Sequence, residues 1–431
     1  MIQQWTACAI DFVNAFCQTE YPELMEPVWV HPPRGYYHDL RGKYVLKLNK
    51  SMYGLRDAPR LWFENLFKHL LSPDLGFTQS SNDQCLLFRS DMMIIVYVDD
   101  MGVAAQREEL IDELVSYLCD KGLVLEREGT FQDYLGIRFN TLPNGSVHMT
   151  QSGLIRKIIK ATGMESCNPN KLPAQKACLG KDLNGEPMNH NEFNYRSVVG
   201  MLLYLSGNTR PDITFAVSQV ARFTHNPKKT HATAVKMIVR YLSGTADKGI
   251  IVPHFEGDLT LRVYVDADFA GLYNIDPPED PDSAKSRTGF IIFLGTCPLI
   301  WKSFLQSKAT MSTLEAEYSA LSSSLRVALP IIQIARLAVS IVEVPTKFRS
   351  IFQCACIVFE DNNGALILAK TQRTTSRTKY FNVEWHFFWQ HVKDGTLEVE
   401  RIATVDQVAD YLTKGCSREI FQRIRKTVQG W

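Results

Sequence analysis

The longest apolar run of the chain reads Met92-Met93-Ile94-Ile95-Val96-Tyr97-Val98, and it stops at Asp99-Asp100. The run is too short to cross a bilayer but suits a buried strand. Apolar and small residues resume at Met101–Ala105, so we predict a hairpin with Asp99 and Asp100 in its turn. Aspartate also favours turns for purely local reasons. Because the strand before this turn is apolar on both faces, we expect the turn to emerge from a core.

A second acid, Asp11, follows the short apolar strand Cys8-Ala9-Ile10. Two strands that each end in an acid can bring their carboxylates side by side. Like charges held this close are costly unless a cation lies between them. Mg²⁺ favours a few carboxylates together with phosphate oxygens, and two such ions can activate a 3′-hydroxyl and stabilise a leaving pyrophosphate. We therefore expect Asp11, Asp99 and Asp100 to form a metal site.

A later strand, predicted at Thr260–Val265, runs into Asp266 and Asp268. Because side chains alternate along a strand, these two aspartates share the face opposite Val263 and Val265. Surface aspartates at the end of a strand are one interpretation of this pattern. A second carboxylate site is the other.

The long helix predicted at about 313–342 gives two acids different roles. Glu315 lies three residues after Ser312, which is the spacing of a capping box, so it has a structural task at the start of the helix. Glu317 has no such task, and it falls on the apolar stripe that includes Leu321. A carboxylate on a stripe that faces the core needs a partner or a metal ion. This position favours function for Glu317.

Two further acids follow. Asp361 ends the predicted strand Cys356–Glu360, and ligands commonly gather at the carboxyl ends of strands in α/β proteins. Asp410 lies in a helix that we predict to open with a second capping box at Thr404. It shares a helix face with Asp406, and either of these acids could serve only the helix dipole.

Length and segment pattern predict an α/β protein of three parts. The 431 residues exceed one ordinary core, and 45% hydrophobic with 22% charged residues is usual for a globular chain. We place the domains at 1–167, at 168–255 and at 256–431, the last an α/β domain with a mixed sheet. The middle part begins with a polar linker, Asn168–Asn191. An acidic, proline-rich insertion, Asn274–Asp282, is expected to be a solvent loop.

Charge, cysteines and the start of the sequence exclude several classes of protein. The net charge of +1 gives no global basic signal, so nucleic-acid contact would have to come from local patches. Met1–Trp5 has neither the basic start nor the apolar run of a signal peptide. The ten cysteines show no metal-ligand spacing, and Cys354-Ala355-Cys356 reads as two core thiols. We expect a reduced, intracellular protein without membrane association.

Four motifs of the first part resemble those of copia-type retrotransposon reverse transcriptases. They are Ala9–Phe16, Leu48–Trp62, Tyr97–Asp100 and Tyr134–Ile137. The resemblance implies the α+β palm of a right-hand polymerase, in which Asp11, Asp99 and Asp100 bind the metal ions. It also implies that Phe16 is a steric gate that excludes the ribose 2′-hydroxyl of a ribonucleotide.

Three later motifs resemble the ribonuclease H of the same copia-type elements. They are Val265–Gly271, Ser312–Tyr318 and Asp406–Asp410. The resemblance implies a ribonuclease H-like α/β domain whose catalytic, metal-binding acids are Asp266, Glu317, Asp361 and Asp410. It selects Asp266 rather than Asp268 and Glu317 rather than Glu315. Both active sites are expected to bind two Mg²⁺ ions, with Mn²⁺ as a substitute.

The family's basic, histidine-containing stretch is also present. Lys370–Lys379 carries Arg373, Arg377 and Lys379 and no acid, so phosphate contact and a solvated helix flank are both open interpretations. The resemblance implies that the partners are an RNA template, a DNA primer, RNA–DNA hybrids and dNTPs. It adds other polyprotein parts, such as integrase and capsid, and a location in cytoplasmic virus-like particles and the nucleus.

The resemblance covers nearly the whole chain, including the middle part at Tyr195–Gly200 and Asn208–Phe215. Only about ten residues precede Asp11, where the family carries a fingers region. We therefore expect an N-terminally truncated polymerase with weak or absent DNA synthesis beside a complete ribonuclease H. The rival hypothesis is a catalytically inactive retrotransposon relic that only binds nucleic acid or a partner.

Overall fold

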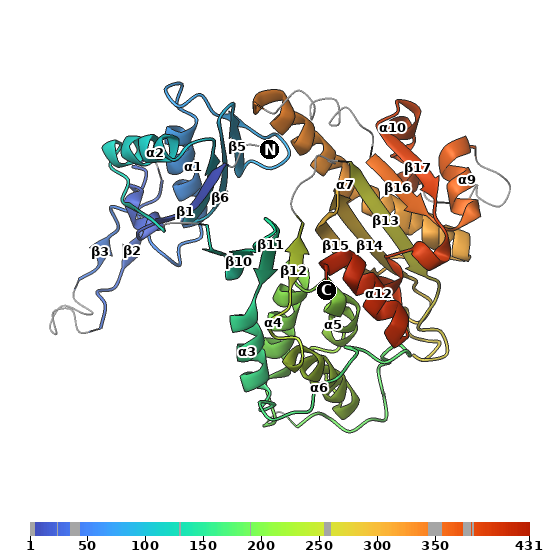
Figure 1. The fold of residues 1–431 in the computed structure, drawn as a ribbon. Helices are drawn as coiled ribbons and strands as arrows, with labels where there is room; N and C mark the ends of the chain where they lie inside the picture. The colour runs from blue at the N-terminus through green and yellow to red at the C-terminus, as the bar shows by residue number, and fades with distance from the viewer. Residues whose placement is uncertain are drawn as a thin grey trace. The chain divides into compact units, whose positions relative to one another are not determined.

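The computed structural model describes residues 5–23, 25–34, 44–128, 131–189, 191–253, 260–343, 356–373, 381 and 383–431. The chain divides into two compact units, residues 1–135 with 337–344 and residues 136–336 with 345–431. Both mix helices and strands, which confirms the predicted α/β class (Figure 1).

The first unit is built on a six-stranded sheet. Its strands lie in the order β4 (Thr78–Gln79), β5 (Leu86–Arg89), β6 (Met92–Tyr97), β7 (Asp100–Ala105), β1 (Thr6–Phe12) and β8 (Leu125–Arg127). Two helices, α1 (Ala58–Leu70) and α2 (Glu108–Asp120), form one core with the sheet. The remaining short elements are η1 (Ala15–Gln18), β2 (Trp29–Val30), β3 (Leu46–Lys47) and β9 (Asp133–Tyr134).

Alternation along the strands of this sheet separates a buried face from an open one. Ile10, Val96 and Val103 point into the core shared with the helices. On the other face, Ile95 is 41% and Tyr97 is 59% exposed. The strand that we predicted to be enclosed on both faces is thus buried on one face only, and its turn rises at the open face.

The second unit begins with an antiparallel ladder and a group of helices. The strands are β10 (Ile137–Thr141), β11 (Val147–Thr150) and β12 (Ile250–Val252). The helices are α3 (Ser152–Ala161), α4 (Tyr195–Asn208), η2 (Pro211–Ile213), α5 (Thr214–Ala221), α6 (Lys229–Ser243) and, from the end of the chain, α12 (Arg418–Gln429). They share one core, so the predicted helical block at about 192–248 is confirmed.

A five-stranded mixed sheet completes the second unit. Its order is β15 (Cys297–Leu305), β14 (Arg287–Leu294), β13 (Leu261–Asp268), β16 (Cys356–Glu360) and β17 (Leu397–Arg401). β13 pairs antiparallel with β14 and parallel with β16. The long helix α7 (Thr313–Ile341) packs on one face, and the helical group packs on the other. Short elements follow: α9 (Asn363–Thr371), η4 (Val383–His386), α10 (Trp389–Lys393), η5 (Thr404–Asp406) and α11 (Asp410–Thr413).

This packing differs from the predicted domain boundaries. Ile155 of α3, which we assigned to the first part, is buried in the core of the second unit. The boundary predicted at residue 255 also falls inside that unit, because Ile291 and Trp301 of the mixed sheet share a core with the helical group. The helical group and the α/β sheet therefore form one compact unit.

The acidic, proline-rich insertion is not wholly a solvent loop. The insertion predicted as a solvent loop holds the buried Asp276, which accepts hydrogen bonds from the Lys181 backbone (2.6 Å) and from Arg222 (2.8 Å).

Among the described residues, α7 is the one helix long and apolar enough to cross a membrane, with a mean hydropathy of 1.5. Its buried apolar residues between Ala316 and Ile332 pack against the mixed sheet, whereas only 28% of its apolar window is buried.

Candidate active sites

Neighbouring strands bring the first group of acids together. Asp11 pairs directly with Asp100 in the antiparallel ladder of β1 and β7. Asp99 lies in the turn between β6 and β7, and its carbonyl accepts a 2.9 Å hydrogen bond from the Phe12 amide. The predicted hairpin is therefore present and brings these acids close to Asp11, but Asp100 is the first residue of β7 and not, as we had predicted, part of the turn.

The turn that carries these acids has strained backbone, and a hydrogen bond from helix α1 holds it in place. Val98 has a φ of 58°, in the left-handed region that a β-branched residue rarely adopts. The indole Nε1 of Trp62 on α1 donates a 2.6 Å hydrogen bond to the Val98 carbonyl. Strained backbone of this kind persists where surrounding structure holds it, and it concentrates at functional sites.

Burial and mutual repulsion act on this first group. Burial, together with Asp99 and Glu126, raises the pKa of Asp11. Burial, together with Asp99 and Asp11, also raises the pKa of Asp100. Repulsion of this kind is what a bound cation relieves.

Phe16 stands beside the first group of acids. It is 9% exposed, and its ring centroid lies 4.6 Å from that of Tyr53. Burial and the charge of Asp99 raise the pKa of Tyr53, so this aromatic pair borders the acids. Apart from its place in the family motif, the sequence holds no signal for Tyr53. The gate role of Phe16 stays a prediction.

The second group of acids is gathered more tightly. Asp266, Glu317 and Asp361 each offer a carboxylate oxygen, and these atoms lie within 4.8 Å of one another. Asp266 comes from the end of β13, Glu317 from the start of α7, and Asp361 from the residue after β16. Within the described part of the chain, this is the group whose spacing suits a metal ion.

Glu317, at the start of α7, is almost fully enclosed. It is 5% exposed, and its Oε2 atom has no hydrogen-bond partner. Burial, followed by the charges of Glu360, Asp266 and Asp361, raises its pKa to about 10. Glu315 instead caps α7, because its amide bonds to Ser312 Oγ at 3.2 Å and its carboxylate accepts from the Met311 amide at 2.7 Å. The capping role predicted for Glu315 is confirmed, and the catalytic role of Glu317 stays a prediction.

The two aspartates of β13 also separate. Asp266 is 4% exposed, accepts a hydrogen bond from the Thr413 hydroxyl and lies 4.0 Å from Lys414 Nζ. Burial raises its pKa to about 7 with help from Asp410 and Asp361, although Lys414 opposes the shift. Asp268 turns toward Gly271, where an added methyl carbon would lie 1.8 Å from its Oδ2 atom. Asp268 is therefore not part of the cluster.

The last two acids are positioned by the segment that follows β17. Asp361 accepts a 2.8 Å hydrogen bond from Thr404, and Asp410 forms a 2.8 Å ion pair with Lys414. The capping box predicted at Thr404 is wrong, because Gln407 turns inward and donates to the Val265 carbonyl at 2.8 Å. Residues 404–406 form a separate 3₁₀ turn, and α11 starts only at Asp410.

Sequence reasoning missed Glu360. It ends β16 on the strand face that also carries Cys356 and Val358, and it is fully buried. Burial, together with Asp361 and Asp266, raises its pKa to about 8. The alternation of the strand holds the signal, because Glu360 continues the buried face of Cys356 and Val358, but we considered only Asp361 at this strand end.

Of the three basic residues predicted to contact nucleic acid, one lies among the described residues. Arg373 is exposed after α9, whereas Arg377 and Lys379 lie outside the described residues. A basic hollow of about 380 Å³ lies between β15 and α7, lined in part by Lys302, Lys308, Arg326, four serines and Trp385. Gln306 in its wall donates a 2.9 Å hydrogen bond to the carbonyl of Ala316, the residue before Glu317. No local sequence pattern marks it, since its cations are far apart in the chain.

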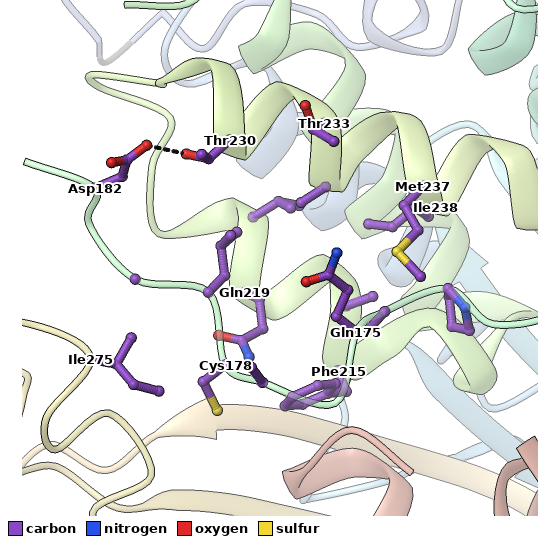
Figure 2. A pocket seen from close by; sticks show the side chains of 18 of the residues that line it. Gln175, Cys178, Asp182, Phe215, Gln219, Thr230, Thr233, Met237, Ile238 and Ile275 are labelled. Atoms are coloured by element: carbon purple, nitrogen blue, oxygen red, sulfur yellow. Dashed lines mark hydrogen bonds between the residues drawn. The ribbon is translucent and has the colours of Figure 1, made fainter. Parts of the chain in front are cut away.

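A separate cavity of about 530 Å³ lies beneath the predicted linker, where residues 173–182 cross α5 and α6. Figure 2 shows Gln175, Cys178 and Gln219 around it, with Thr230 bonded to Asp182 at 2.7 Å at one side. None of the predicted site residues lines this cavity. It shows that the polar linker is packed onto the helical group.

Comparison with known proteins identifies similar chains. Residues 1–176 match the family described as reverse transcriptase (RNA-dependent DNA polymerase). A retrovirus-related Pol polyprotein from transposon RE1 of Arabidopsis thaliana is 32% identical over 431 residues, covering 99% of this chain and 27% of that protein. The Pol polyprotein from transposon TNT 1-94 of Nicotiana tabacum is 30% identical over 430 residues, covering 97% and 30%.

A shorter relative is matched over most of its own length. A transposon Ty5-1 protein of Saccharomyces cerevisiae is 30% identical over 301 residues, which are 68% of this chain and 92% of that protein. By contrast, the chain spans only 27% to 30% of the length of the Pol polyproteins.

Proposed function

Since the chain belongs to the copia-type family of retrotransposon Pol polyproteins and carries its reverse transcriptase domain, we propose that it combines RNA-directed DNA synthesis with ribonuclease H cleavage of RNA–DNA hybrids. The first unit carries the polymerase site, and the mixed sheet of the second unit carries the nuclease site. The close approach of Asp266, Glu317 and Asp361 is the observation that carries the nuclease half.

The donor set of the nuclease site fits Mg²⁺ or Mn²⁺. All of its donors are carboxylate oxygens, which hard divalent cations prefer. The unpartnered Oε2 atom of the buried Glu317 also calls for a ligand. A bound pair of such ions would activate the attacking water and stabilise the departing 3′-oxygen of the RNA strand.

The surrounding residues hold these acids in place. Thr413 and Thr404 donate to Asp266 and Asp361, which fixes the direction of both carboxylates. Lys414 pairs with Asp410 and lies near Asp266, so it offsets part of their negative charge. Hydrogen-bonded neighbours of this kind orient ligands and tune the affinity of metal sites.

The polymerase half rests on the pairing of Asp11 with Asp100 and on Asp99 in the adjoining turn. These acids would hold the ions that act on the primer 3′-hydroxyl and the triphosphate of the incoming dNTP. Phe16 would exclude ribonucleotides by contact with the 2′-hydroxyl. Its ring is already braced by Tyr53, so it can offer a fixed wall.

The basic hollow supports a path for the hybrid toward the nuclease site. Lys302, Lys308 and Arg326 supply positive charge beside the start of α7, where Glu317 lies. Such contacts to phosphate give affinity without sequence preference. Arg373, Arg377 and Lys379 remain proposed backbone contacts. We further propose that the chain works beside other polyprotein parts, such as integrase and capsid, in cytoplasmic particles and the nucleus.

Cleavage of a hybrid with a labelled RNA strand tests the nuclease half. We expect Mg²⁺-dependent cutting by the wild type, and loss of cutting on Asp361→Asn and on Asp266→Asn. Asp268→Asn is the matched control, because it lies on the same strand outside the cluster. Equal cutting by Asp361→Asn would exclude this site. Tight hybrid binding with no turnover in Mg²⁺ or Mn²⁺ would favour the inactive relic.

Primer extension on an RNA template tests the polymerase half separately. Incorporation of dNTPs that disappears on Asp100→Asn, with hybrid cleavage kept, would assign synthesis to the first unit. No extension by the wild type under conditions that support cleavage would leave the nuclease as the activity of this chain.

A further inference from the structure

Among the ion pairs of the described residues, Lys414 supplies the cation at the acids of the nuclease site. Its Nζ atom lies 2.8 Å from Oδ1 of Asp410 and 4.0 Å from Oδ2 of Asp266. Two of the four acids that we expect to bind metal therefore share one ammonium group.

The four acids do not all gather at one point. Asp266, Glu317 and Asp361 offer oxygens within 4.8 Å of one another, whereas Asp410 is not a member of that group. The group of three is enough for one ion, since Mg²⁺ completes its shell with water and phosphate oxygens. A second ion of a two-ion mechanism would need Asp410 as a ligand. Asp266 can link the two positions, because it belongs to the group and also shares Lys414 with Asp410.

Burial differs between the lysine and its two partners. The side chain of Lys414 is 46% exposed, whereas those of Asp410 and Asp266 are 13% and 5% exposed. The backbone of the lysine is held, because its amide bonds to the Asp410 carbonyl at 3.2 Å. The next residue is Gly415, where an added methyl carbon would stand 2.3 Å from the Gln175 carbonyl oxygen. The lysine side chain can thus turn into solvent while its backbone and the two acids stay in place.

An ammonium group at this position partly replaces a metal ion. It carries a positive charge and three N–H donors, so it satisfies carboxylates that would otherwise repel one another. It does not activate water as a divalent ion does. The two kinds of cation exclude each other here, because they need the same carboxylate oxygens and carry like charge.

We propose that Lys414 occupies the position of the second divalent cation, between Asp266 and Asp410, and has to leave before that ion binds. The inference rests on the proposed nuclease function, because it assumes that these acids bind divalent ions. The two ions then bind unequally. The group of three accepts the first without moving a side chain, whereas the second competes with the lysine.

Calorimetric titration of the full chain with Mg²⁺ and with Mn²⁺, without nucleic acid, tests this inference independently of activity. The wild type is compared with Lys414→Met, which keeps an apolar stem and removes the ammonium group. We expect the second ion to bind about 10-fold more tightly in the variant, which is the gain if the lysine occupies the position about nine-tenths of the time. The first ion should gain less. Lys236→Met is the matched control, because Lys236 is 40% exposed and pairs with Glu192 in the helical group.

A double-mutant cycle separates competition from the general effect of a nearby charge. Asp410→Asn removes a ligand of the second position, so adding Lys414→Met to it should no longer strengthen the binding of a second ion. Equal strengthening of both ions by Lys414→Met, or a gain that persists in Asp410→Asn, would overturn the inference.

Two further outcomes separate the inference from the proposed function. Unchanged ion binding in Lys414→Met, with the first ion still bound, would sink the inference and leave the proposed function intact. Failure of the wild type and of Lys414→Met to bind either metal would remove both.

Thermal unfolding guards against a folding defect. In EDTA, Lys414→Met should unfold at a lower temperature than the wild type, because Asp266 and Asp410 lose their shared counter-charge. Adding Mg²⁺ should raise that temperature more than it does in the wild type, since no side chain has to leave. A smaller rise than in the wild type would contradict the inference. If Lys414→Met does not fold, Lys414→Gln, which keeps a hydrogen-bond donor, decides by the same criterion.

Discussion

The hydroxyl of Thr404 donates a 2.8 Å hydrogen bond to the carboxylate of Asp361, which lies 43 residues earlier in the chain. Thr413 makes the equivalent contact with Asp266. Each of the two aspartates at the strand ends is thus oriented by a threonine from the segment after β17. This segment acts as a brace for the site, although it contributes only Asp410 from the family's set of acids.

Replacing Thr404 with valine should therefore weaken metal binding without disturbing the fold. Valine keeps the shape but cannot donate to Asp361, and loss of such a partner usually costs 10- to 100-fold in metal affinity. The Mg²⁺ concentration that gives half-maximal hybrid cleavage should rise accordingly, while saturating Mg²⁺ restores most of the rate. Thr427→Val on the exposed side of α12 is the control. An unchanged Mg²⁺ dependence would show that the hydrogen bond is dispensable.

Gly289 should not tolerate alanine, because it lies opposite Asp266 in the ladder of β13 and β14. A methyl group there would stand 2.6 Å from Thr413 Cγ2 and 2.8 Å from Leu412 Cβ. α11 would have to retreat, and Thr413 would move from Asp266. We expect about 1–3 kcal/mol lower stability, typical of overpacking, together with a larger loss of cleavage. Urea unfolding measures the first effect and hybrid cleavage the second.

The control for this substitution is Gly200→Ala. Gly200 lies in α4 with nothing within 4 Å of an added methyl group. Alanine suits a helix better than glycine, by up to about 1 kcal/mol, so this variant should be as stable as the wild type or more so. Wild-type stability in Gly289→Ala would mean that α11 can shift freely, which would contradict the tight contact.

The acids that could be predicted are those whose place follows from local pattern. Asp11 lies near the end of the apolar strand β1, Asp100 begins β7 directly after the turn of an apolar hairpin, and Glu317 lies on a helix stripe that faces the core. Strand alternation and helix periodicity decide such positions before any tertiary contact forms.

The residues that could not be predicted depend on contacts between distant segments. Gln407 matched the spacing of a helix cap, yet its side-chain amide donates a hydrogen bond to the buried carbonyl of Val265 instead. Asp276 looked like part of a solvent loop because its counter-ion, Arg222, is far away in the sequence. Local propensity fails at such positions because one tertiary partner outweighs it.

A buried ion pair in the helical group should be essential for the stability of the second unit. Arg210 and Asp212 are paired at 2.9 Å with both side chains fully buried. Tyr241 donates to Asp212 at 2.5 Å, and Gln429 approaches it at 3.4 Å from the end of the chain. Asp212→Asn leaves Arg210 without a counter-charge, which costs about 3–5 kcal/mol in buried pairs.

Urea unfolding of Asp212→Asn measures this cost. The control, Glu192→Gln, breaks the pair of Lys236 and Glu192, whose side chains are 40% and 38% exposed. Breaking it should change stability by no more than about 1 kcal/mol. Equal effects of the two substitutions would mean that water reaches Arg210.

Removing positive charge from the basic hollow should weaken hybrid binding in a salt-dependent way. Lys302→Gln with Lys308→Gln removes two phosphate contacts if the hybrid follows this wall. Each lost contact should lower the slope of log affinity against log salt by about one unit. Titrations at several KCl concentrations measure the slope, and Lys426→Gln on α12 is the control. An unchanged slope would place the hybrid elsewhere.

His231 should make the packing of the linker sensitive to acid. Its ring stacks on Phe223 with centroids 3.8 Å apart, its Nδ1 accepts from the Lys228 amide, and its Nε2 bonds to the Gly180 carbonyl. These partners require a neutral ring with the proton on Nε2. Burial lowers the pKa of His231 below its usual 6.5, although the bond to Gly180 opposes the shift.

The direction of the pH effect follows from proton counting. Between the lowered pKa and 6.5, the unfolded chain binds more protons at this histidine than the folded chain does. Its contribution to stability is therefore complete above about pH 6.5 and is lost as the pH falls through the folded-state pKa.

His231→Gln cannot titrate, so the difference in unfolding free energy between wild type and variant should shrink from pH 7.5 to pH 5. The exposed His225→Gln is the matched control. Protection factors of residues 177–182 against hydrogen exchange should also fall in acid in the wild type, because charging the ring breaks the hydrogen bond from the Lys228 amide, which holds the ring against Gly180. A difference that stays constant over this range would show that His231 carries its proton without leaving its partners.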